Sequence, residues 1–163
     1  MTPDVQTIAK DRMRYTKDKF SSMLAILAIV FDCLYFVSIY QSDVGTFYYN
    51  WLIGVSIVYN LIFLLAAFLA SESVKNRKTG YSGILTVLGV IQIARIFILP
   101  AQAHAATVLV NGVETVVMGD KQYLYCVACL VISAVCCIVA AVVSAKNNKT
   151  LADYMKTLEN KAA

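Results

Sequence analysis

Charged residues are scarce in this chain: Lys, Arg, Asp and Glu make up 15% of its 163 residues, whereas an average soluble domain carries about 25%. The apolar segments also lack a polar stripe. Each helix of a soluble bundle has such a stripe, and it faces water. These absences exclude an ordinary soluble bundle. The apolar residues form four runs, each long enough as a helix to cross a hydrocarbon core of roughly 30 Å.

The four runs predict an all-α integral membrane protein, a four-transmembrane-helix bundle in one membrane domain that covers residues 1–163. Its transmembrane helices are expected at about residues 20–40, 51–70, 81–99 and 123–145. Residues 1–19 and 146–163 are expected to be tails.

Histidine is almost absent too, which removes much of the chemistry that enzymes use. The one histidine, His104, follows the third run, so a single chain cannot hold haem between two helical histidines, and no metal site is predicted. The sequence contains no nucleotide-binding glycine loop, catalytic triad or paired-carboxylate site. Gly80, Gly83 and Gly89 are interpreted as packing positions. The main expectation is a non-enzymatic protein without a cofactor.

Basic residues are divided unevenly between the two sides of the four runs. Twelve lie in the two tails and the second connection, and one, Lys121, lies in the other two connections. The positive-inside rule therefore predicts that both termini are cytoplasmic. The expected location is the plasma (inner) membrane. Aromatic residues at the expected outer interface agree: Tyr40, Tyr48, Tyr49, Trp51, Tyr123 and Tyr125. The net charge of +4 favours anionic lipid headgroups as partners, and no nucleic acid.

Three segments outside the runs carry local patterns. After the third run, the sequence TVLV, Asn111-Gly112 and VETVV predicts a β-hairpin on the outer side, either a lid over the bundle or a docking edge for a partner. The C-terminal segment, with Thr150 and Asp153 as a capping box, predicts a short separate amphipathic helix along the inner headgroups or on a cytoplasmic partner. The N-terminal segment predicts a solvated helical extension of the first transmembrane helix.

Four polar residues interrupt the runs at nearly one depth: Asp32, Asn60, Gln92 and Arg95. An unpaired charge at the centre of a membrane helix costs roughly 2.5–3.5 kcal/mol. We therefore expect Asp32 to pair with Arg95, with Asn60 and Gln92 as further hydrogen-bonding groups. This polar cluster is interpreted either as an ion pair that fixes helix register or as a site for an ion, proton or solute.

Cys126 and Cys129 form a C-x-x-C near the outer end of the last run. A helix brings positions i and i+3 together, so such a pair is able to form a disulfide and transfer electrons. Four helices, cytoplasmic termini and this motif resemble the vitamin K epoxide reductases and their bacterial homologues. The resemblance implies a quinone-linked thiol–disulfide oxidoreductase with Cys126 and Cys129 as its redox pair. Both expected outer loops lack cysteine, so electrons would pass directly between this pair and a partner.

The last run also offers a packing explanation for its cysteines. Small residues recur every four positions: Cys129, Ser133, Cys137, Ala141 and Ala145. Such a stripe lets membrane helices approach closely. The favoured function is a non-enzymatic subunit of a transport-type membrane complex, or of a homo-oligomer. The alternatives are an ion or solute permease at the polar cluster and the oxidoreductase at the C-x-x-C pair.

Overall fold

A computed structural model describes residues 5–40, 51–110 and 113–162 of the chain. The expected turn at Asn111-Gly112 lies outside the described residues, as do residues 41–50 with Tyr48 and Tyr49. The side chain of Trp51 is not described either.

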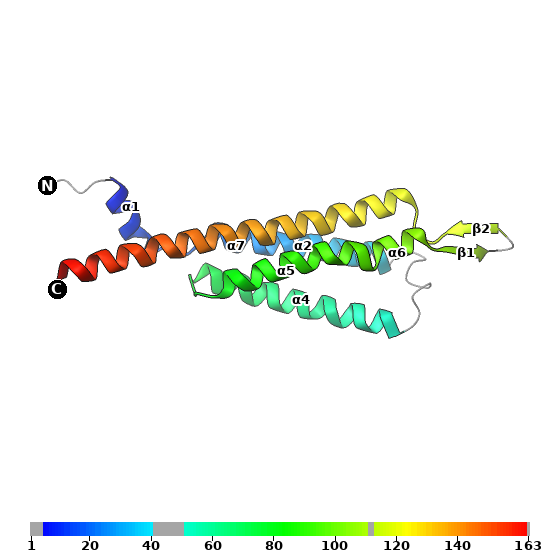
Figure 1. The fold of residues 1–163 in the computed structure, drawn as a ribbon, viewed down its shortest axis with the longest axis horizontal. Helices are drawn as coiled ribbons and strands as arrows, with labels where there is room; N and C mark the ends of the chain where they lie inside the picture. Colours follow the sequence, from blue (N-terminus) through cyan, green and yellow to red (C-terminus); the bar gives the residue numbers. More distant parts are fainter. Residues whose placement is uncertain (1–4, 41–50, 111–112, 163) are drawn as a thin grey trace.

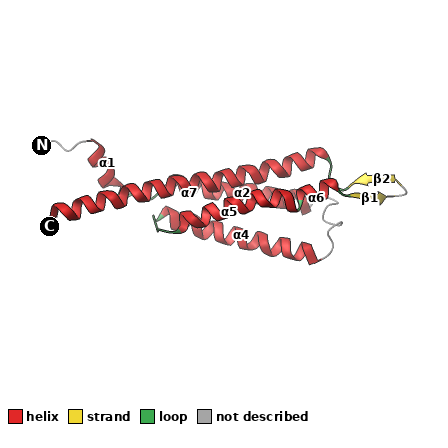
Figure 2. Ribbon diagram, viewed as in Figure 1, coloured by secondary structure: helices red, strands yellow, loops and turns green. Residues whose placement is uncertain are grey.

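Four long helices form an elongated bundle (Figures 1 and 2), and each contains a stretch long and apolar enough to cross a membrane. They are α2 (Lys19–Tyr40), α4 (Trp51–Lys75), α5 (Tyr81–Ile98) and α7 (Asp120–Ala162). The four-helix prediction is therefore confirmed. α7 packs along α2 and α5, and α4 packs against the same two helices. Figure 1 shows that α2, α4 and α5 alternate in direction.

Small side chains predominate in the interior of the bundle, and many large apolar side chains lie on its surface. Ala28 and Ala67 are completely buried, whereas Leu61, Leu65 and Val142 are 61%, 62% and 61% exposed. A bundle in water would bury these large groups, because each contributes roughly 1.5–3 kcal/mol when it leaves water. Membrane helices meet through small residues and keep large apolar residues toward lipid. This arrangement indicates a membrane protein.

Gly89 lies where α5 and α7 come close together. A Cβ atom at this position would lie 2.7 Å from Ile138 Cγ1 and 3.2 Å from the carbonyl oxygen of Ala134. A Cβ at Gly83 would have no described neighbour within 4 Å. Gly80 precedes α5 with φ of 92°, a backbone conformation that favours glycine. Of the three glycines interpreted as packing positions, Gly89 is therefore the one in a helix contact.

α7 continues without a break to Ala162, which corrects the prediction of a short separate C-terminal helix. No proline or glycine lies between Asp120 and Ala162 to end the helix. Thr150 Oγ1 donates to the Lys146 carbonyl oxygen at 3.0 Å within the helix instead of capping a new one. The extension therefore projects beyond the bundle along the α7 axis (Figure 1).

The N-terminal segment is a separate helix, α1 (Val5–Met13), and not an extension of α2. Asp18 explains the break, because it acts as the N-cap of α2. Its Oδ1 accepts a hydrogen bond from the Ser21 backbone N–H at 3.2 Å, and its Oδ2 accepts one from Ser21 Oγ at 3.0 Å. An aspartate at this position stabilises the start of a new helix.

A short helix and a hairpin connect α5 to α7. α6 (Pro100–Ala105) begins at Pro100, and β1 (Thr107–Val110) pairs antiparallel with β2 (Val113–Val116). The two strands occupy the segments in which the sequence predicts a hairpin. They project beyond the end of the bundle (Figure 1), so the hairpin does not cover the described helices as a lid.

Candidate functional site

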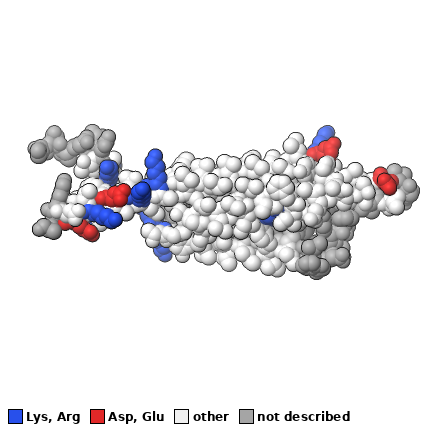
Figure 3. Space-filling view, in the orientation of Figure 1, with Lys and Arg blue, Asp and Glu red and all other residues white. Residues whose placement is uncertain are grey.

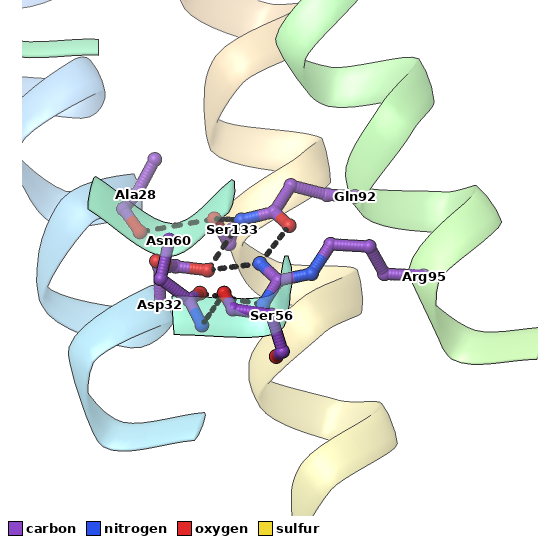
Figure 4. Close-up of polar contacts among 7 residues, drawn as sticks. All are labelled: Ala28, Asp32, Ser56, Asn60, Gln92, Arg95 and Ser133. Carbon is purple, nitrogen blue, oxygen red and sulfur yellow. Dashed lines mark hydrogen bonds and ion pairs between the residues drawn. The ribbon is translucent and has the colours of Figure 1, made fainter. Parts of the chain in front are cut away.

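A buried ion pair lies inside the bundle (Figure 4). Arg95 on α5 places Nη1 2.6 Å from Oδ1 of Asp32 on α2, and the two side chains are 8% and 1% exposed. The pairing expected from the sequence is therefore present. Each charge would be costly alone among these apolar helices, and the contact neutralises both.

Three further polar side chains surround the pair. Gln92 Nε2 donates to Asp32 Oδ1 at 2.8 Å, and Gln92 Oε1 accepts from Arg95 Nη1 at 2.8 Å. Asn60 Oδ1, on α4, accepts from Arg95 Nη2 at 2.5 Å. Ser133, on α7, accepts from Gln92 Nε2 at 3.2 Å. Each of the four long helices thus contributes at least one side chain to a single network.

Helix backbone fixes two members of this network in place. Ser133 Oγ donates to the Ala28 carbonyl oxygen at 2.9 Å, which ties α7 to α2. Asn60 Nδ2 donates to the Ser56 carbonyl oxygen at 2.9 Å, one turn earlier on α4. These bonds restrict both rotamers, so the acceptor of Asn60 points to the guanidinium of Arg95 (Figure 4).

Two tyrosine rings cover the guanidinium of Arg95. The Arg95 Cζ atom lies 4.7 Å from the ring centroid of Tyr35 and 4.6 Å from that of Tyr59. A desolvated cation–π contact is worth about 2 kcal/mol. Neither ring contact was predicted from the sequence. The signal was available for Tyr35, because it lies three positions after Asp32 and therefore on the same helix face.

Three oxygen atoms of this site are buried without a hydrogen-bond partner among the described residues: Asp32 Oδ2 and the hydroxyls of Tyr35 and Tyr59. The two donors to Asp32, from Gln92 and Arg95, both reach Oδ1. An unsatisfied buried polar group costs about 1–3 kcal/mol. A water molecule, a proton or a small polar solute that bonded these oxygens would recover part of that cost.

The C-x-x-C cysteines are free thiols in the bundle interior. Cys126 is fully buried and Cys129 is 3% exposed. Cys126 Sγ lies 3.6 Å from Ser38 Oγ, on α2. A redox-active thiol has to be reached by the molecule with which it exchanges electrons, and this burial opposes direct exchange with a partner. The oxidoreductase alternative stays a prediction.

The small-residue stripe of α7 follows the buried face over most of its length. Four members are buried: Cys129, Ser133, Cys137 and Ala141. Ala145 is exposed, so it does not belong to the helix contact expected for it. Positions four apart drift about 40° per step around a helix with 3.6 residues per turn, and the row leaves the contact. Ser144, three positions after Ala141, is fully buried in its place.

His104 lies in a local packing contact at the end of the bundle that carries the hairpin. Its ring stacks on Tyr123, with 4.5 Å between the ring centroids, and its Nδ1 lies 3.2 Å from the Met118 carbonyl oxygen. Within the described residues, no group of three or more His, Cys, Asp and Glu is placed to hold a metal ion.

No family model, curated protein or solved structure matches this chain. The resemblance to vitamin K epoxide reductases therefore stays a prediction that depends on the C-x-x-C motif and the number and orientation of the helices. Function has to be inferred from the chain's own residues.

Proposed function

We propose that this chain is a multi-pass protein of the plasma (inner) membrane and acts as a non-enzymatic subunit of a transport-type membrane complex or of a homo-oligomer. One observation carries the membrane location: small residues predominate inside the bundle, and many large apolar residues are exposed on its outside. Lipid is the surrounding in which that surface is stable, because lipid tails are as apolar as the side chains that face them.

The distribution of charge supports cytoplasmic termini. Lys and Arg gather at the end of the bundle that carries both termini and the α4–α5 connection, and the long sides are almost free of charge in this view (Figure 3). Basic residues are retained on the cytoplasmic side. The hairpin at the other end then faces outward.

Two projecting elements support a role in assembly. In the hairpin, Leu109 and Val116 are 70% and 54% exposed, although such side chains are ordinarily covered. At the opposite end, the α7 extension carries Leu151, Tyr154 and Leu158 on one face, and each is half-buried. The charges of the ion pair, in contrast, neutralise each other within the chain. Surfaces suited to partners therefore lie outside the bundle.

Site-directed labelling tests the orientation. Glu114→Cys should react with a membrane-impermeant maleimide in intact cells, and Lys78→Cys should react only after the cells are permeabilised. The wild-type protein, with its native thiols, is the background control. Labelling of Lys78→Cys in intact cells would contradict cytoplasmic termini.

Cross-linking in cells, followed by purification in a mild detergent, tests assembly. We expect a stoichiometric membrane partner or a homo-oligomer that is reduced by Leu109→Lys. Glu114→Gln is the matched control, because Glu114 lies directly opposite Leu109 in the hairpin and the change leaves the apolar side chain in place. A monomer that cross-links to no other chain would refute the proposal.

A permease or channel at the polar cluster is the second candidate, and the three buried oxygens that have no partner among the described residues favour it. Intramembrane ionisable residues commonly mark ion or proton pathways. Liposomes containing the purified protein and a pH-sensitive or cation-sensitive dye would reveal the flux. If this candidate is correct, the flux should exceed that of empty liposomes. The flux should also fall in Tyr59→Phe, which keeps the ring over Arg95 but removes the hydroxyl that has no described partner.

A further inference from the structure

An open pocket of about 680 Å³ lies where the α1–α2 connection meets the end of α4. It is lined by residues of two chain segments, Tyr15, Thr16, Lys17, Asp18, Lys19, Phe20 and Arg77. The pocket is far from the ion pair: Lys19 begins α2 and Arg77 follows α4, so it lies at the end of the bundle that carries the termini.

Arg77 has a backbone conformation that ordinarily selects glycine. Its φ is 55°, and the described part of the chain contains no other non-glycine residue with positive φ. The Arg77 N–H donates to the Val74 carbonyl oxygen at 2.9 Å, and the Lys78 N–H donates to the Ser73 carbonyl oxygen at 3.0 Å. These two bonds form a Schellman motif with Arg77 at the position that glycine prefers. The backbone conformation favours glycine at this position, so it does not account for an arginine. The reason for an arginine has to lie in the contacts of its side chain.

The side chain of Arg77 lies at the pocket wall, and one of its guanidinium nitrogens has no partner among the described residues. Its Nε donates to the Thr16 carbonyl oxygen at 3.0 Å, which bridges the two chain segments. Its Nη1 is shielded from water and has no partner among the described residues. A buried guanidinium donor without an acceptor is unusual, and a planar guanidinium is well suited to bind phosphate oxygens.

The charges around the pocket favour an anion. Lys17, Lys19 and Arg77 supply three cations, against one carboxylate, Asp18. Both oxygens of that carboxylate are already occupied: Oδ1 accepts from the Ser21 N–H, and Oδ2 accepts from Ser21 Oγ and from Asn147 Nδ2. The Asp18 carboxylate is therefore engaged in hydrogen bonds with Ser21 and Asn147. Because it is not paired with Lys17 or Lys19, both lysines are able to attract an incoming anion.

We propose that this pocket binds the phosphate of an anionic lipid headgroup, with Arg77 as the principal ligand and Lys17 and Lys19 as supporting charges. Phosphate is the chemistry that a lipid headgroup and a free phosphate share. The lipid is favoured because Tyr15 and Phe20 line the same pocket and are 80% and 60% exposed, which suits the boundary between headgroups and acyl chains. The inference rests on the proposed membrane location.

Native mass spectrometry of the full chain in a neutral detergent tests the site, with phosphatidylglycerol, phosphatidylcholine, inorganic phosphate and glycerol phosphate as separate additions. We expect retention of phosphatidylglycerol, with about fivefold or greater weakening in Arg77→Gly. Glycine suits φ of 55°, so this variant preserves the cap of α4. Lys78→Ala, which removes a neighbouring charge that does not line the pocket, should leave the affinity nearly unchanged.

Equal weakening in Arg77→Gly and Lys78→Ala would overturn the site, because it would indicate general surface attraction. Equal retention of phosphatidylcholine would overturn the anionic headgroup. Binding of inorganic phosphate or glycerol phosphate as tight as that of the lipid would overturn a lipid source. A protein that is extracted from cell membranes by alkaline carbonate contradicts the proposed membrane location instead. A membrane-inserted protein that fails the lipid test contradicts only this inference.

Discussion

Arg95 and Asp32 lie 63 positions apart in the sequence, and Arg95 Nη1 lies 2.6 Å from Asp32 Oδ1 in the structure. The contact joins α5 to α2 in a core made largely of small and apolar side chains. Each charge is tolerated there because the other is present. Removal of both should therefore be less harmful than the two single losses suggest.

The first prediction is a double-mutant cycle on this pair. Asp32→Ala leaves a buried guanidinium with the neutral acceptors Asn60 and Gln92, and Arg95→Ala leaves a carboxylate with one donor, Gln92. Each single change should cost about 3–5 kcal/mol. Arg95→Ala should be the worse, because the short carboxylate cannot extend toward the membrane surface. The free energy of unfolding in detergent and the amount of protein that accumulates in cells are measured for the wild type, both single variants and the double variant.

The double variant, Asp32→Ala with Arg95→Ala, should recover much of the lost stability. Tyr59→Phe is the control within the same site: it keeps the ring over Arg95 and removes a buried hydroxyl that has no described partner, so the stability should not fall and should rise by up to about 1–3 kcal/mol. Additive losses in the double variant would mean that the two charges do not interact. Recovered stability without recovered function would favour the permease candidate.

The second prediction compares two glycines of α5. Gly89→Ala should destabilise the bundle by about 1–3 kcal/mol, because the new methyl group overlaps Ile138 and approaches the Ala134 carbonyl oxygen. Gly83→Ala meets no described atom within 4 Å and should be neutral or stabilising by up to about 1 kcal/mol. Thermal unfolding in one detergent separates them. Equal effects would show that α5 and α7 are not in close contact at Gly89.

Hydrophobic length predicted the four long helices well, because a run of about 20 apolar residues has few other stable arrangements. The ends were harder to predict. The helix α4 continues past the apolar run to Lys75, and the Schellman motif at Arg77 ends it. At the C-terminus, Thr150 has the sequence of a cap but bonds one turn back within α7. A serine, threonine or aspartate is able to cap a new helix or to bond to the backbone of the preceding turn within a continuous helix. Because α7 is continuous here, Thr150 makes the second kind of bond.

The candidate site was predictable where charge required a partner. A lone aspartate and a lone arginine in apolar runs indicate each other, and Asn60 and Gln92 followed from depth. Tyr35 and Tyr59 were not predicted, because aromatic residues are common in apolar runs and their contact with Arg95 depends on helix rotation. Ala145 was misplaced for the same reason: a strict spacing of four does not follow one helix face over four turns.

The third prediction concerns the thiols. Cys126→Ala should cost about 1 kcal/mol or less, since alanine keeps a small surface between α7 and α2, whereas Cys126→Leu should cost more than about 2 kcal/mol by overpacking. Cys33 is exposed on the surface of α2, so Cys33→Leu is the matched control and should be tolerated. If Cys126→Ala abolished function, and the wild-type pair shifted between thiol and disulfide in cells, the oxidoreductase alternative would be favoured.

The last prediction concerns Asp18, which connects three helices. Its carboxylate caps α2, its Oδ2 accepts from Asn147 Nδ2 on α7 at 3.0 Å, and its backbone N–H donates to the Lys75 carbonyl oxygen at the end of α4 at 2.9 Å. Asp18→Ala should cost about 1–2 kcal/mol, since it removes the cap and one interhelical bond. Asp18→Ser should retain the cap through the bond from the Ser21 N–H, and it should lose the bonds that Oδ2 accepts from Ser21 Oγ and from Asn147 on α7.

Asn147→Ala separates the two contributions, because it removes the bond to Asp18 and leaves the cap of α2 intact. We expect it to cost about 0.5–1.5 kcal/mol, and no more than Asp18→Ser, which also loses the bond from Ser21 Oγ. Asp153→Ala, which removes an exposed carboxylate from the α7 extension, is the charge control and should be neutral. Hydrogen exchange at the first turn of α2 should accelerate in Asp18→Ala and not in Asn147→Ala. Equal acceleration in both variants would show that the link to α7, and not the cap, holds the start of α2.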